Sequence, residues 1–154
     1  MVATSSVRTR VRDEIVRRLN QHDNLLGPDG NRVPISPGLV GGDAEDEHVF
    51  VVGIRGRRQV AFLEAGRKTV EDDFTISFVF QAATPGADTL EAGDRVEQMA
   101  VALADVLADD PSLGDLDGLM WAVESEANGP DHQLTDEGAI GFMHVDVECK
   151  ARYE

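Results

Sequence analysis

The sequence predicts an α+β fold, in which an antiparallel β-sheet carries an N-terminal helix and a second long helix on one face. Two stretches, 74–81 and 140–152, alternate between side-chain types as strands do. Two others, 6–20 and 88–110, repeat apolar residues at helical spacing. Because 154 residues with 42% hydrophobic content suffice for one buried core, we expect a single domain, 1–154.

The stretch 140–152 is the clearest strand in the sequence. From Met143 to Arg152, apolar or small residues alternate with polar ones without a break. Successive side chains of a strand point to opposite faces, so this strand has one buried and one solvated face. Cys149 falls on the buried side, where a small apolar residue fits. As the single cysteine, it forms no internal disulfide.

An amphipathic helix is predicted at 6–20. Ser6 and the two hydroxyl residues before it offer N-caps. The outer side is rich in arginine, which suits either contact with a polyanion or the solvated or partner-facing side of a packed helix. Asp13 and Glu14 interrupt the basic run and favour the second reading. The inner, apolar side recurs every four residues, at Val7, Val11, Ile15 and Leu19.

Two long loops are expected, at about 21–47 and 55–72, on either side of a β run at 49–54. The first contains turn residues at 27–30 and ends in an acidic patch at 43–47, which lacks the ligand spacing of a calcium loop. Within the second, basic turns at 55–58 and 66–68 border a short apolar run at 60–63, which together with the run at 49–54 looks like two strands with an exposed arginine tip. Its basic residues are Arg55, Arg57, Arg58, Arg67 and Lys68.

Phenylalanine dominates the next strand, where Phe74, Ile76, Phe78 and Phe80 alternate with outward residues. We expect it to pair with the run at 49–54 and to share a core with 140–152. After it, Asp88 or Asp94 is expected to cap the helix 88–110, since each has a glutamate three residues later. The apolar stripe of this helix comprises Val96, Met99, Ala100, Leu103, Val106 and Leu107.

The tryptophan lies in a short predicted strand, 119–124, which follows the helix-ending residues Pro111 and Gly114. A polar link at 124–137 should return the chain to the terminal strand. We therefore expect these two strands to form an antiparallel hairpin.

Acidic residues are concentrated in the second half of the chain. The formal net charge is −15, and the segment 85–149 holds one basic residue, Arg95, against 16 acidic ones. Such acidity argues against a broad nucleic-acid-binding face and against docking on anionic membranes. No stretch approaches the roughly 20 apolar residues of a membrane span, and the N-terminus does not resemble a signal peptide, so we expect a cytoplasmic protein.

The sequence offers no catalytic or metal-binding constellation that we can identify. The four histidines lack the spacing of a helical zinc pair, and no phosphate loop, dinucleotide-binding glycine motif or nucleophile elbow is present. The strongest remaining combination is Asp136, Glu137 and His144. If 140–152 is an extended strand, His144 lies far from the two acidic residues. We therefore expect no enzyme, no cofactor and no metal site.

The order of the elements and several short motifs resemble those of a known family. In order, the sequence shows the helix 6–20, the strand ending in Phe80, the D-P-S-L-G turn at 110–114, the tryptophan strand, and D-E-G-A at 136–139 before the terminal strand. This succession resembles the tail terminator proteins of long-tailed, siphovirus-like phages and related tailed viruses. The resemblance spans most of the chain. The long loop at 21–47 and the high acidity depart from it.

The resemblance implies a structural virion protein without catalytic residues. Copies, six in the family, would form a ring that caps the tail tube, stops its growth and meets the neck proteins of the filled head. Double-stranded DNA would pass through without specific binding. The protein would be assembled in the host cytoplasm and reside in the tail or neck of the virion, away from membranes.

Two sets of charged residues are candidate contact surfaces for this role. The basic loop residues Arg55, Arg57, Arg58, Arg67 and Lys68 would dock on an acidic partner, and an acidic set would line the lumen or rim of the ring. The acidic set comprises Glu97, Asp105, Asp109, Glu124 and Glu126. Two alternatives remain: a head-completion or neck connector protein, and a small non-viral α+β binding domain.

Overall fold

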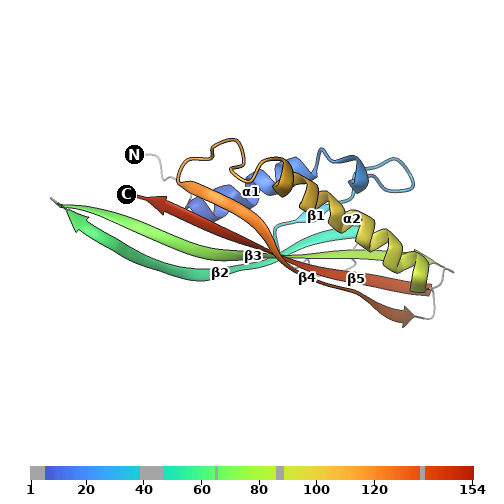
Figure 1. Cartoon of the computed structure of the whole chain (residues 1–154). Helices are drawn as coiled ribbons and strands as arrows, with labels where there is room; N and C mark the ends of the chain where they lie inside the picture. Colours follow the sequence, from blue (N-terminus) through green and yellow to red (C-terminus); the bar gives the residue numbers. More distant parts are fainter. Residues whose placement is uncertain (1–5, 39–46, 65, 86–88, 136–137) are drawn as a thin grey trace.

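The fold is α+β, as predicted, with two helices on one face of a five-stranded sheet. This computed structural model describes residues 6–38, 47–64, 66–85, 89–135 and 138–154. The elements are α1 (Val7–Leu19), the short 3-10 helix η1 (Asp23–Leu25), β1 (Ile35–Ser36), β2 (Glu47–Glu64), β3 (Arg67–Pro85), α2 (Thr89–Asp109), β4 (Leu119–Thr135) and β5 (Gly138–Tyr153). Figure 1 shows both helices on the same side of the strands.

The sheet has the strand order β1-β2-β3-β5-β4. The four long strands are antiparallel to their neighbours, including the expected pairs of β2 with β3 and of β4 with β5. The two-residue strand β1 lies within the stretch 21–47, which was predicted as a loop. It pairs parallel to β2, so the sheet is mixed at this edge. We call the side that carries α1 and α2 the helix face, and the opposite side, where Ser77 and Asp146 lie, the open face.

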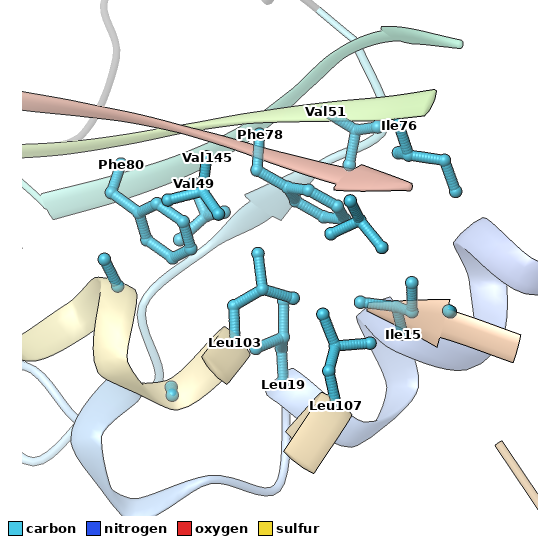
Figure 2. Close-up of a cluster of buried hydrophobic side chains, with 14 of the residues drawn as sticks. Ile15, Leu19, Val49, Val51, Ile76, Phe78, Phe80, Leu103, Leu107 and Val145 are labelled. Atoms are coloured by element: carbon cyan, nitrogen blue, oxygen red, sulfur yellow. The ribbon is translucent and has the colours of Figure 1, made fainter. Parts of the chain in front are cut away.

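The core forms between the helix face and the two helices. β3 lies at the centre of the sheet, and its residues Phe74, Ile76, Phe78 and Phe80 are almost completely buried. Figure 2 shows Phe78 and Phe80 directed toward Leu103 of α2. Burying an aromatic side chain of this kind contributes about 1.5–3 kcal/mol, so this strand is a major source of stability.

Helix α1 agrees with the prediction at 6–20. Ser6 accepts a hydrogen bond at its Oγ from the Thr9 backbone N–H at 3.3 Å, which satisfies an otherwise unpaired donor of the first turn. The residues at intervals of four, Val7, Val11, Ile15 and Leu19, are all buried. The apolar stripe therefore decides which side of the helix packs on the sheet.

Helix α2 spans Thr89–Asp109 and buries its predicted stripe, including Val96, Met99 and Leu103. Asp94 lies inside this helix, so the prediction that it caps the helix is wrong, and Asp88 lies outside the described residues. No helix in the described part of the chain is long and apolar enough to cross a membrane.

The D-P-S-L-G turn after α2 is built around the carboxylate of Asp110. This carboxylate accepts hydrogen bonds from Ser112 Oγ at 2.8 Å and from the Gly114 backbone N–H at 2.7 Å. It also pairs with Arg18 Nη1 of α1 at 3.1 Å. Leu113 is buried beneath the turn. The motif is thus a compact connection that ties the end of α2 to α1.

The predicted loop at about 55–72 is wrong, because these residues continue β2 and β3 as one long hairpin. We call its projecting part, residues 55–64 and 66–72, the hairpin arm; it extends past the start of α1 (Figure 1). A bulge at Val52 shifts the register of β2. Before the bulge the odd-numbered residues Val49 and Val51 face the helices, and after it the even-numbered positions Gly56 and Arg58 do. This bulge breaks the alternation that would have revealed the strand.

The predicted polar link at 124–137 is also mostly strand. β4 continues to Thr135 opposite β5, with register shifts near Met120, Ser125 and Gly129. These irregularities and the run of exposed polar residues hide the period of two that a strand normally shows.

Gly56 is required by the close approach of the hairpin strands. A Cβ at this position would lie 2.2 Å from the Asp73 carbonyl oxygen and 2.5 Å from the Phe74 Cα. Gly56→Ala should therefore lower the free energy of unfolding by about 1–3 kcal/mol in urea denaturation. Gly53→Ala is the matched control, because nothing lies within 4 Å of its Cβ; equal losses in both variants would contradict this explanation.

Candidate interaction surfaces

A buried carboxylate, Asp72, joins the base of the hairpin arm to α1. Its side chain is fully buried, in phase with Phe74 on the helix face. Arg8 Nε donates to Asp72 Oδ2 at 2.8 Å, and Arg8 Nη2 donates to Oδ1 at 2.6 Å, a bidentate geometry. Arg58 Nε donates to the same Oδ2 at 3.1 Å. Strands β2 and β3 and helix α1 thus meet at one anion.

These contacts decide the charge state of Asp72. Burial raises the pKa of this carboxyl. The hydrogen bonds from Arg8 and Arg58 lower the pKa by more than burial raises it, so the net pKa lies below its ordinary value of 3.8. The Arg8 guanidinium also lies over the Phe74 ring, with its Cζ 5.4 Å from the ring centroid. The group therefore closes the end of the core with a satisfied ion cluster.

The basic candidate residues are divided between two faces. Arg58 points to the helix face and serves Asp72, whereas Arg55 lies on the open face, donating to Ser77 Oγ at 3.1 Å and to Asp146 Oδ2 at 3.4 Å. Arg57 is exposed, opposite Asp73 in the register. Arg67 and Lys68 lie at the far end of the arm, where Lys68 is exposed. The structure does not bring the five residues into one cluster.

The acidic candidate residues are all exposed but occupy two different elements. Glu97, Asp105 and Asp109 lie on α2, and Glu124 and Glu126 lie on β4. Asp105 also contacts His22 Nε2 at 3.1 Å. The helix carries one acidic surface and the edge of the sheet another.

The basic side of α1 is neutralised within the chain. Glu14 accepts from Arg17 Nη2 at 2.6 Å and from Arg18 Nε at 3.0 Å. The hydrogen bond from Arg17, reinforced by that from Arg18, lowers the pKa of Glu14 to about 2. These intrahelical pairs favour the packed-helix reading over a polyanion-binding face.

Arg95, the basic residue of the acidic segment, is a structural anchor. Its Nη1 donates to the Asn24 carbonyl at 3.1 Å and to Gln98 Oε1 at 2.8 Å, and its Nη2 donates to the Leu26 carbonyl at 2.8 Å. Nη2 and Nε together bind the Glu47 carboxylate. All five N–H donors of the guanidinium are therefore used inside the chain.

Two hollows in the described surface hold no convergent catalytic groups. One, of about 980 Å³, is bordered by the segment 26–34, and its charged residues Glu47 and Arg95 bind each other. The other, of about 710 Å³, lies between the ends of α1 and α2 and is wide open. Among the described residues, no group of three or more His, Cys, Asp or Glu side chains could hold a metal ion.

The histidines lie apart from one another. His48 is buried, stacked on Phe50 with ring centroids 4.3 Å apart, and contacts Ser36 Oγ at 2.7 Å. His132 and His144 are exposed on β4 and β5. Asp136 and Glu137, considered with His144 in the sequence, lie outside the described residues.

Comparisons with known proteins give a similarity at the level of the fold. No protein-family model matches the sequence, and no curated protein matches it. The fold is similar to a chain in a solved structure described as the virion of a native gene transfer agent (GTA) particle, with a TM-score of 0.60 and 12% identity. The match covers 97% of this chain and 100% of the other. It therefore includes the hairpin arm as well as the core.

Asp72→Asn tests the ion cluster at the base of the arm. Removing the charge while keeping the shape leaves Arg8 and Arg58 without their anion, so the free energy of unfolding should fall by about 3 kcal/mol in urea denaturation. Asp73→Asn, at the exposed neighbouring position, should change it by less than about 0.5 kcal/mol. Similar losses in the two variants would contradict the assignment.

The same cluster predicts a pH dependence of stability. Because the pKa of Asp72 is depressed on folding, its contribution is complete above the ordinary value of 3.8 and is lost as pH falls through the lower folded-state pKa. The stability difference between the wild type and Asp72→Asn should thus stay level from about pH 7 to pH 5 and shrink below about pH 4. Urea titrations at each pH measure it, and a difference that grows in acid would refute this account.

Proposed function

We propose that this chain is a structural virion protein that acts as a tail terminator, a ring of copies capping the tail tube and joining it to the head or neck. The observation that carries this proposal is the fold match to a gene transfer agent virion chain, which spans both chains almost end to end. The described surface adds to it, because its charged groups are arranged as exposed sets or internal pairs rather than converging in a pocket.

The acidic side of α2 suits the wall of a DNA passage. Glu97, Asp105 and Asp109 are exposed along one helix, and α2 contains a single basic residue, which is bound to Glu47. DNA carries a dense negative charge, so an acidic wall keeps the duplex from adhering as it passes. In this proposal α2 faces the lumen. Glu124 and Glu126, on β4, lie on another surface.

The far end of the hairpin arm suits contact with an adjoining ring. Arg67 and Lys68 begin β3 directly after the turn of the hairpin, whose end projects well beyond the helices (Figure 1). Basic groups at the end of a long hairpin can reach an acidic surface of a tube or neck protein. The tube and neck proteins are named as partners because of the terminator function proposed above.

Two alternatives make different predictions. A head-completion or neck connector protein would also form a ring in the virion but would bind the head side and leave tube growth unaffected. A small non-viral binding domain would use the hollow of about 980 Å³ and remain monomeric or dimeric. The full-length fold match favours the two virion roles over the third.

Purified protein should form rings and arrest tube growth. Native mass spectrometry should show one closed oligomer, six copies by the family resemblance. When the protein is added to tail-tube subunits of the same virus, tube lengths in electron micrographs should shorten as the ring-to-subunit ratio rises. The same quantity of heat-unfolded protein is the control.

The outcomes separate the three roles. Rings that bind the head-side neck protein and leave tube length unchanged would identify a neck connector instead. A chain that stays monomeric at high concentration and affects neither partner would overturn the virion proposal.

A further inference from the structure

Both outer edges of the sheet present strands without a neighbour among the described residues. β1 covers β2 only at Val49 and Phe50, which leaves the segment 53–64 with an open edge. β4 is the last strand on the other side and is open along its whole length, Leu119–Thr135. Unpaired edge backbone is a template for pairing with another chain.

The two open edges lie at the same level of the sheet. In the register of the sheet, Arg58 of β2 is opposite Asp72 of β3, Asp72 is opposite Ala151 of β5, and Ala151 is opposite Leu119 of β4. Gly53 leads through Ser77 and Asp146 to Glu126. Segments 53–58 and 119–126 therefore stand at equal height on opposite sides, and a neighbouring copy placed beside this one needs no slide to align them.

The strand directions are compatible with such a pair. β2, β3, β5 and β4 alternate in direction across the sheet, so β2 and β4 run in opposite senses. If a second copy stands alongside in the same orientation, its β4 lies antiparallel to β2 of the first. The contact joins two different surfaces, and such a heterologous contact closes into a ring when its rotation permits.

The charges of the two edges are complementary. The segment 53–58 contains three arginines and no acidic residue, and 119–126 contains Glu124 and Glu126 and no basic residue. In the aligned arrangement, Arg55 stands level with Val123, which precedes Glu124 directly and Glu126 by three positions, and Arg57 stands level with Trp121. Guanidinium groups are favourable beside both carboxylates and indole rings.

Exposed apolar side chains gather on the same two strands. Of the eight large apolar residues that are exposed in the described part of the chain, five belong to β2 or β4. They are Val52 and Val60 on β2, and Met120, Val123 and Leu134 on β4. Single exposed apolar residues need no explanation, but Met120 and Val123 lie within the segment 119–126 itself and add apolar area to the same acidic edge.

We propose that adjacent copies of this chain join edge to edge, with segment 53–58 of β2 in one copy lying antiparallel to segment 119–126 of β4 in the next. The inference rests on the ring function proposed above and names its subunit interface. Bulges in β4 limit regular backbone pairing to short runs such as 121–124, so the side-chain charges set the partner and the register.

Charge exchange tests the interface directly. The double variants Arg55→Glu/Arg57→Glu and Glu124→Arg/Glu126→Arg each place like charges across every contact. Each alone should raise the concentration at which half of the chains are assembled by about tenfold or more. Mixed in equal amounts, every contact becomes complementary again, and rings of alternating variants should re-form, as measured by native mass spectrometry.

Matched controls carry the same charge changes on surfaces away from both edges. Arg12→Glu/Arg17→Glu alters α1, and Glu97→Arg/Asp109→Arg alters α2. Both should assemble as the wild type does. Circular dichroism checks that all variants fold, and rescue on mixing could not be produced by misfolded chains.

A disulfide between copies gives a second readout. In Arg55→Cys/Val123→Cys, the two positions of one chain are separated by β3 and β5, about 14 Å, too far for an internal bridge. Oxidation should therefore yield a ladder of linked chains on a non-reducing gel. The native Cys149 does not compete, because it is buried and its pKa is raised to about 12.

The outcomes separate this inference from the function on which it rests. Wild-type rings that persist in both charge-reversal variants, together with no ladder, would overturn the edge-to-edge contact while leaving the ring proposal standing. Wild-type protein that never assembles would overturn the ring itself. Loss of rings in each variant, with recovery on mixing, supports the contact.

Discussion

The structure depends on covering a single apolar face of the sheet. Phe74, Ile76, Phe78 and Phe80 of the central strand all project to that face and exclude water only when both helices lie on it. Because both helices are used on one side, the open face and the two outer strands are left for other contacts. The position of the apolar side chains thus decides both the core and the surfaces that remain uncovered.

Periodicity predicted the elements whose buried side is continuous. α1, the part of β3 from Phe74 to Phe80, and β5 each show one uninterrupted apolar phase, and the helix 88–110 differs from α2 by a residue at either end. The arm of β2 was missed because the bulge at Val52 reverses the phase, and because glycines beside arginines are typical of turns. Past 124, β4 was missed because its exposed residues are mostly polar on both faces.

The contacts that organise the surfaces could not be read from the sequence, because they join distant residues. Arg8 and Asp72 are 64 positions apart, and nothing local to either indicates the other. The burial of Asp72 could have been predicted, because it continues the alternation of Phe74 and the apolar residues that follow. A carboxylate on a buried face of a strand requires a cationic partner. For the candidate surfaces, the charges could be counted in advance, but the face that each arginine takes follows from the bulge.

Arg95 has a consequence for association. Its hydrogen bonds to the Asn24 and Leu26 carbonyls and to Glu47 fix part of the segment between α1 and β2 against α2 within a single subunit. Docking at that surface would then incur little loss of conformational entropy, since the backbone is already held before any partner arrives. Any partner that binds there would meet a preformed backbone.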